Sequence, residues 1–287
     1  MSSVLNWAFK KEDRFAHLPV LGAGLGYRPS IARELLSHRH KVDFLELIAD
    51  HYFDSSSLRD DELAEVSREF PVVLHAIAMS IGTALPVDEQ YLTELARVVC
   101  DSKALWVSDH LCFTKAGGVD MGQLTPLPFT EESVAVVCEN VSRVKQHLNV
   151  PFLLENITYY FAIPGAEMSE AEFITSVVEG ADCGLLLDLT NLHTNATNHG
   201  YDAHKFLESI PLERVMQIHL AGGTWMRSVL IDSHSSAVPS EVWGLLEFVR
   251  DRAPIKGILI ERDENFPPFS ELIEELDIAR SIMKKEV

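Results

Sequence analysis

The stretch Gly184-Leu-Leu-Leu-Asp188 is a short apolar run that ends in a carboxylate, and this arrangement recurs along the chain. Seven other runs rich in Val, Ile or Leu resemble it, at residues 20–24, 42–47, 72–75, 104–108, 152–155, 215–220 and 257–261. None of them alternates strictly between apolar and polar residues, which favours strands buried on both faces of a parallel sheet.

Segments with helical patterns lie between these runs, at residues 30–37, 88–100, 130–147, 169–179, 204–210, 240–251 and 269–285. Within them, Ser169 and Glu172 have the spacing of a capping box. Strand–helix alternation without a linker or low-complexity segment predicts one α/β domain over residues 1–287, folded as a (β/α)8 TIM barrel.

A doubly wound open sheet is the alternative fold. The run Gly22-Ala-Gly-Leu-Gly26 hints at dinucleotide binding, but its spacing is not G-x-G-x-x-G, and no ribose-binding acidic residue is obvious beyond it. The barrel therefore remains the preferred expectation.

Length, charge and cysteine usage narrow the class of protein. A chain of 287 residues, 47% of them hydrophobic, suits one barrel with a substantial core. It has no apolar run of about 18 residues, and residues 1–14 lack the apolar stretch of a secretory signal, so we expect a soluble cytoplasmic protein. The net charge of −19 argues against a nucleic-acid partner. Four scattered cysteines, at positions 100, 112, 138 and 183, are expected to be reduced, buried thiols.

Polar residues that can bind metals stand at the ends of most of the apolar runs. They are Glu46 with Asp50-His51, His75, Asp109-His110, Glu155-Asn156, Asp188 with Asn191 and His193, His219 and Glu261, while Asp232-Ser-His234 occupies the loop between the last two runs. In a (β/α)8 barrel the carboxyl ends of all strands open onto one face, so these side chains are expected to converge there.

A lone histidine at a strand end is more often structural than a ligand, but so many carboxylates at one face would repel one another and raise their pKa values. Bound divalent cations explain the crowding more economically. Imidazole mixed with carboxylate, without cysteine, suits Fe, Mn or Zn in a catalytic site, since structural zinc more often uses thiolates. At about three protein ligands per ion, these residues are enough to bind about two or three ions. Asp232 and His234 alternate along an extended segment and can share one of them.

The chain also resembles a known family, the multinuclear non-heme iron oxidases, once catalogued as a bacterial family of unknown function among the xylose-isomerase-like TIM barrels. The matching segments, taken in order, are Leu21-Gly-Ala-Gly-Leu-Gly-Tyr-Arg28, Phe44-Leu-Glu-Leu-Ile-Ala-Asp-His-Tyr-Phe53, His75 with Ser80-Ile-Gly82, Ser108-Asp-His-Leu111, Leu127-Pro-Phe-Thr-Glu131, Glu155-Asn-Ile157, Leu187-Asp-Leu-Thr-Asn191, Asn198-His-Gly200, Ile218-His-Leu-Ala-Gly222 and Ile231-Asp-Ser-His234.

The resemblance implies an enzyme that uses two or three iron ions, as mixed Fe(II) and Fe(III), and O2 to modify cysteine residues of ribosomally made precursor peptides (RiPPs). A small partner protein would deliver the peptide as part of a heterodimer. Asp50-His51 replaces the Glu-Asn of many members, which places the chain near the methanobactin and thiaglutamate subgroup. The metal ligands implied are His51, His75, Asp109, Glu155, Asp188, Asn191, His199, His219, Asp232, His234 and Glu261. His199 is expected in the loop after the sixth strand.

The expected chemistry follows from these metals. A substrate cysteine thiolate, a soft and strong ligand, would bind one iron, with O2 at a neighbouring open position, and the reaction would begin by hydrogen abstraction from the cysteine β-carbon. The alternative is a Zn or Mn hydrolase or sugar isomerase of the endonuclease-IV and xylose-isomerase class. The acidic charge disfavours a DNA substrate, and no lysine of the kind sugar isomerases use stands at a strand end. A non-catalytic peptide-binding scaffold is the third hypothesis.

Overall fold

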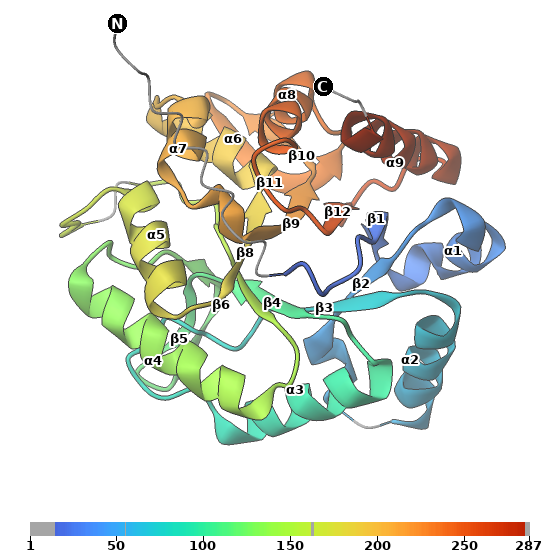
Figure 1. The fold of residues 1–287 in the computed structure, drawn as a ribbon, viewed down its shortest axis with the longest axis horizontal. Helices are drawn as coiled ribbons and strands as arrows, with labels where there is room; N and C mark the ends of the chain where they lie inside the picture. Colours follow the sequence, from blue (N-terminus) through green and yellow to red (C-terminus); the bar gives the residue numbers. More distant parts are fainter. Residues whose placement is uncertain (1–14, 55, 162–163, 285–287) are drawn as a thin grey trace, which may run out of the picture.

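Eight parallel strands close into a barrel at the centre of the computed structural model (Figure 1), which describes residues 15–54, 56–161 and 164–284. Each strand pairs in parallel with its neighbours, and β1 closes the ring against β12. The barrel strands are β1 (Gly22–Gly26), β2 (Leu45–Ile48), β3 (Val72–Ala76), β4 (Val107–His110), β7 (Phe152–Glu155), β8 (Gly184–Asp188), β9 (Val215–Leu220) and β12 (Gly257–Ile260). The predicted barrel is thus confirmed, and the open sheet is wrong.

Helices surround the barrel and connect its strands. They are α1 (Ala32–Ser37), α2 (Ser57–Glu69), α3 (Glu89–Ser102), α4 (Glu131–His147), α5 (Glu170–Gly180), α6 (Leu189–His199), α7 (Ala203–Ser209), α8 (Ser240–Val249) and α9 (Phe269–Lys284). The capping box at the start of α5 is present, with the Ser169 and Glu172 side chains each bonded to the other residue's backbone N–H.

Two of these helices, α2 and α6, were not predicted from the sequence. Helix α2 buries only Leu63 and Val66, so its apolar periodicity is weak. Helix α6 is rich in Asn and Thr, which are poor helix formers, and it begins because Asp188 caps it by accepting a hydrogen bond from the backbone of Asn191. The expectation that His199 lies in a loop is therefore wrong, since it is the last residue of α6.

The barrel separates two apolar cores. Outward-facing residues such as Leu74, Leu154 and Ile258 pack under the helices in the larger core. Inside the barrel a smaller core is built from Phe15, Phe44, Val73, Trp106, Leu153, Leu186, Met216 and Leu259. This division follows from strand geometry, because successive side chains point to opposite faces of a sheet.

The interior changes from apolar to polar within two residues along several strands. His75 follows Val73, Glu155 follows Leu153 and Asp188 follows Leu186, each at the next inward position and each buried. The same step leads from Phe44 to Glu46, from Trp106 to Ser108 and from Leu259 to Glu261. The apolar layer therefore forms the floor of a polar mouth at the carboxyl ends of the strands.

The glycines near the start of the chain serve packing inside the barrel. A Cβ atom on Gly24 would lie 2.6 Å from the Phe44 ring and 2.5 Å from its carbonyl oxygen. Only glycine lets the two strands carry this ring between them. The glycine run thus has a structural role in the barrel.

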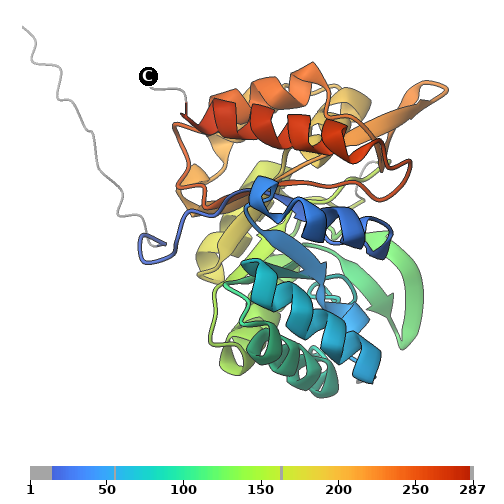
Figure 2. The same cartoon turned by 90° about the vertical axis from the view of Figure 1, so that its right-hand side faces the viewer.

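Two hairpins extend from the side of the barrel onto which the strands open (Figure 2). They are β5 (Phe113–Ala116) with β6 (Val119–Thr125), and β10 (Gly222–Met226) with β11 (Val229–Ser236). Asp232 and His234 lie within β11, so their expected position in a loop is wrong. The sequence does contain an indication of this hairpin, because Thr, Trp, Val and Ile favour strands on either side of the turn at Arg227.

Other expectations have mixed outcomes. All four cysteines are unpaired as predicted, and Cys112 and Cys183 are buried, but Cys138 is only partly buried and Cys100 is exposed, on the outer side of α3. Within the described part of the chain, no helix has the length and apolar character needed to cross a membrane. The expectations for residues 1–14, and that of one domain across residues 1–287, extend beyond the described residues and stay predictions.

We expect Leu153→Ala to lower the free energy of unfolding by about 2–5 kcal/mol, because it leaves a cavity in the floor beneath Glu155. Leu58→Ala, at a side chain that is 80% exposed, is the control and should change it by less than about 0.5 kcal/mol. Urea denaturation measures both. Equal midpoints for the two variants would show that the inner core does not support the barrel.

Candidate metal centre

Seven side chains, six of them on strands and one just after β12, form three overlapping groups of metal-binding atoms at the barrel mouth. The groups are His75, His110 and Glu155, then Glu155, Asp188 and His219, then Asp188, His234 and Glu261, and in each the ligand atoms lie within 4.8 Å of one another. Glu155 belongs to the first two groups and Asp188 to the last two. The metal-binding atoms at the mouth therefore form one continuous line, in which two carboxylates are shared between neighbouring groups.

Several of these donors are buried without a hydrogen bond to any described residue. They are Glu155 Oε2, Asp188 Oδ2 and His219 Nδ1. Buried polar atoms are nearly always hydrogen-bonded, so a cluster of exceptions calls for an ion or water. Imidazole nitrogen and carboxylate oxygen converging in this way fit a divalent transition metal.

The imidazole of His75 is held with one nitrogen free for the mouth. Its Nδ1 lies 2.8 Å from the hydroxyl of Ser108, which itself donates to the Leu74 carbonyl at 3.3 Å. The hydroxyl must therefore accept from Nδ1–H, which leaves Nε2 as the unprotonated atom. Nε2 faces Glu155 Oε2 at 3.4 Å and His110 Nε2 at 3.2 Å. A second hydrogen bond of this kind orients many metal-binding histidines.

Burial and charge act in opposite directions on the acids of the mouth. Burial raises the pKa of Asp109 and of Asp188 well above the usual range, and the negative charge of Glu155 adds to both shifts. Burial also acts to raise the pKa of Glu155, but the neighbouring His110 and His219 overcome it and lower that pKa to about 2. The expected upward shift therefore holds for the two aspartates and not for Glu155, because imidazoles already supply positive charge beside it.

The third group is built on a strained backbone. His234 has φ of 47°, which is unusual for a residue with a side chain inside a strand. Its carbonyl accepts from the backbone of Asp263 at 3.0 Å, and its Nδ1 lies 3.1 Å from the Asp263 carboxylate. Its Nε2 lies 2.7 Å from Asp232 Oδ1. Such strain is typical of residues held in place for function.

Seven of the predicted ligands meet at the mouth in this way: His75, Glu155, Asp188, His219, His234 and Glu261 within the three groups, and Asp232 in contact with His234. Asp109 lies beside them, fully buried, with Oδ1 accepting from the His110 backbone and Oδ2 without a hydrogen bond among the described residues. It belongs to none of the three groups.

The remaining predicted ligands are placed differently. His51 is exposed on a 3-10 helix (Ala49–Tyr52). The amide of Asn191 is engaged on both sides, accepting from Thr158 at 2.6 Å and donating to the Asn156 carbonyl at 3.0 Å. His199 Nε2 lies 2.9 Å from the Tyr159 carbonyl, and the two rings stack at 4.5 Å. Neither His51 nor His199 belongs to a group of metal-binding atoms among the described residues, whereas Asn191 lines the cavity above the mouth.

Two residues at the mouth were not chosen as ligands from the sequence. His110 joins the first group, and alternation gives the signal, because Trp106, Ser108 and His110 are successive inward positions of one strand. Glu46 follows Phe44 inward in the same way and contacts His219 Nε2 at 3.1 Å.

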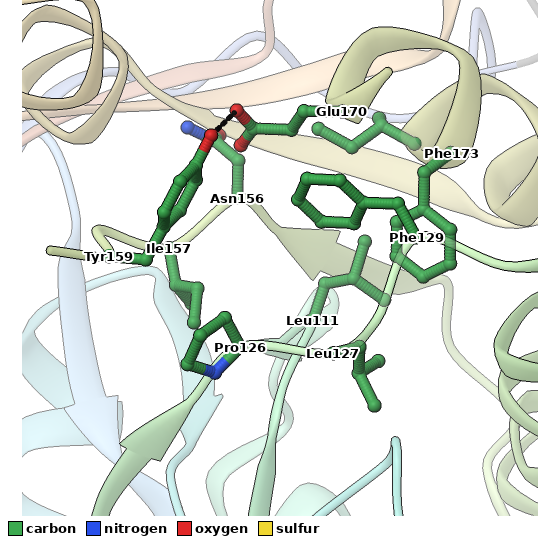
Figure 3. A pocket seen from close by; sticks show the side chains of 10 residues that line it. Leu111, Pro126, Leu127, Phe129, Asn156, Ile157, Tyr159, Glu170 and Phe173 are labelled. Carbon is green, nitrogen blue, oxygen red and sulfur yellow. Dashed lines mark hydrogen bonds between the residues drawn. The ribbon is translucent and has the colours of Figure 1, made fainter. Parts of the chain in front are cut away.

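A cavity of about 300 Å³ opens above this centre. His110, Glu155, Asp232 and His234 line it from the mouth, with Tyr159, Tyr160, Phe161 and the end of β6 also on its walls. Tyr159 also lines a smaller apolar pocket, where its hydroxyl donates to Glu170 at 3.0 Å (Figure 3). This hydrogen bond fixes the side chain of Tyr159. The cavity can admit a substrate side chain to the metal-binding atoms.

Comparison with known proteins agrees with this geometry. The family model for the RiPP precursor modification enzyme MbnB/TglH/ChrH matches residues 22–284. A UPF0276 protein of Caulobacter vibrioides is 39% identical over 264 residues, covering 92% of this chain and 94% of its own. Another from Neisseria gonorrhoeae is 37% identical over 263 residues, covering 90% and 93%.

Solved structures share the fold. The D-psicose 3-epimerase of Clostridium cellulolyticum H10 superposes with a TM-score of 0.59 at 12% identity, over 92% of this chain and all of that one. A xylose isomerase domain protein of Alicyclobacillus acidocaldarius gives 0.59 at 13% identity, with the same coverage. At such identities the likeness shows the fold alone. The family match over most of the chain confirms the resemblance, and the chain belongs to the MbnB/TglH/ChrH family of RiPP precursor modification enzymes.

Proposed function

We propose that this enzyme is an iron- and O2-dependent oxidase that modifies a cysteine residue of a ribosomally synthesised precursor peptide. The observation that supports it is the line of three donor groups joined by Glu155 and Asp188. Carboxylates shared between groups suit neighbouring ions, as a multinuclear centre requires. Family membership supplies the peptide substrate, and the mixed imidazole and carboxylate donors suit iron.

The ligands divide among the ions according to these groups. His75 and His110 would hold one ion with Glu155, His219 would hold the next between Glu155 and Asp188, and His234 and Glu261 would hold a third with Asp188. Asp232 would join the third through its contact with His234. Iron bound there would supply the one-electron chemistry with O2 needed to cleave a carbon–hydrogen bond beside a thiol. Asp109, His51, Asn191 and His199 stay predicted ligands, and Asn191 would bind through the second lone pair of its Oδ1, which accepts from Thr158.

The cavity supplies the place for the substrate. Its walls of Tyr159, Tyr160 and Phe161 would pack against the peptide and exclude water, while the cysteine side chain reaches the donors below. Delivery by a small partner protein in a heterodimer, and location in the cytoplasm, stay predictions. The tip of the β10–β11 hairpin is a candidate partner contact, because Trp225 and Met226 are about two-thirds exposed there, at 63% and 66%.

The shared carboxylate predicts a specific pattern of metal loss. After anaerobic loading with Fe(II), we expect about two or three irons per chain in the unmodified enzyme, at about three protein ligands per ion. Glu155→Gln should remove at least two of them, because two groups use this residue, whereas His234→Ala should remove one. Mass spectrometry of the metal content measures this. Equal losses in the two variants would contradict shared ligation.

The iron-loaded enzyme, supplied with its precursor peptide and partner, should consume O2 and change the mass of the peptide. A peptide with Ser in place of the modified Cys should cause no O2 uptake, because the alcohol neither binds iron as a thiolate does nor supplies the same carbon–hydrogen bond. An oxygen electrode and peptide mass spectrometry test both. Turnover with Zn²⁺ and without O2 uptake would instead favour the hydrolase or isomerase class.

A further inference from the structure

A chain of buried hydrogen bonds runs through the barrel beneath the metal centre and ends on His219. We propose that Trp106, Gln217 and Glu46 form a relay that fixes the protonation of His219, so that its Nδ1 atom, and not Nε2, is offered to the ion. Glu46 is thereby a positioning residue and not a ligand. The inference rests on the proposed function only in that a cation must bind at the mouth.

The relay begins at Trp106, which is fully buried in the floor of the barrel. Its indole Nε1 lies 2.5 Å from Gln217 Oε1. An indole N–H can only donate, so the oxygen of the Gln217 amide must face Trp106. The amide nitrogen is thereby turned toward β2, where it donates to Glu46 Oε2 at 2.6 Å.

A second side chain, that of His219, contacts the same oxygen of Glu46. His219 Nε2 lies 3.1 Å from Glu46 Oε2, and it also lies 3.0 Å from Gln217 Nε2. The imidazole has two ways to satisfy this arrangement. Either Nε2 carries a proton and donates it to Glu46, or Nε2 is bare and accepts from Gln217.

The charge of Glu46 decides between these two. A carboxylate accepts only, and Glu46 is 4% exposed, so it gains from every donor that reaches it. A charge-assisted bond from Nε2–H to the carboxylate is also stronger than a neutral bond from the Gln217 amide. We therefore assign the proton to Nε2.

The consequence lies on the other side of the ring. His219 Nδ1 is buried without a hydrogen bond to a described residue, 3.3 Å from Glu261 Oε2 and 3.6 Å from Glu155 Oε1. With the proton held on Nε2, a lone pair on Nδ1 points between the two carboxylates. In the opposite tautomer a proton would occupy that place and exclude the ion.

Zinc binding to the purified chain tests the relay directly. In zinc-loaded protein labelled with ¹⁵N-histidine, the NMR spectrum should show His219 bound through Nδ1 and protonated at Nε2. Glu46→Leu removes the acceptor and should weaken zinc binding about 10–100-fold, whereas Glu46→Gln keeps an acceptor oxygen without the charge and should restore only part of the affinity. Binding through Nε2 in the unmodified protein would overturn the proposal.

Glu275→Leu is the matched control, because Glu275 is also buried and hydrogen-bonded but lies on α9 and bonds Val238 and Arg262. It should leave zinc affinity within about twofold, well inside the range of outer-shell effects. Equal losses in Glu46→Leu and Glu275→Leu would show a merely structural role and overturn the proposal.

If Glu46→Leu does not fold, Trp106→Phe replaces it. This change releases the Gln217 amide and should lower both the zinc affinity and the fraction of His219 bound through Nδ1, while an unchanged spectrum would count against the relay. Because zinc is the probe, the result can be read even if the iron-loaded enzyme consumes no O2.

Discussion

The arrangement of the mouth depends on one constraint: charges taken out of water need partners. Closing eight strands into a barrel brings Glu155, Asp188, His219 and Glu261 together above an apolar floor, where water is largely excluded. Part of the compensation is internal, since imidazoles lower the pKa of Glu155. Asp188 lacks such compensation, because its pKa is raised and its Oδ2 atom has no hydrogen bond to a described residue. Bound cations would supply the missing positive charge, since an uncompensated buried charge is costly.

Sharing of carboxylates links this constraint to the proposed chemistry. Glu155 and Asp188 each serve two groups, so neighbouring ions would sit close enough to act on one substrate. Beneath them, Ser108 and Glu46 determine which nitrogen of His75 and of His219 faces the mouth. The barrel therefore provides more than ligands, because it also sets the orientation of the rings that carry them. The cavity above has room for a peptide side chain.

The fold was largely predictable, because all eight barrel strands are apolar runs in the sequence and most of these runs end in polar residues. The convergence of His75, Glu155, Asp188 and His219 followed from that pattern, since every strand end opens on one face. Strand ends alone do not tell which neighbour points inward, and Asp109 was preferred over His110 because of the family resemblance. Helix α6 was missed because a buried cap overrides weak local preferences, whereas the β10–β11 hairpin was missed although its residues favour strands. Positions such as His199 depend on contacts with Tyr159 that no spacing reveals.

The most direct test of the central claim is anomalous X-ray diffraction at the iron absorption edge from crystals of the anaerobically loaded enzyme. The account predicts at least two neighbouring peaks at the barrel mouth, one beside His75 and Glu155 and the next beside Glu155, Asp188 and His219. A mouth without a peak, or a single ion that does not contact Glu155, would contradict it.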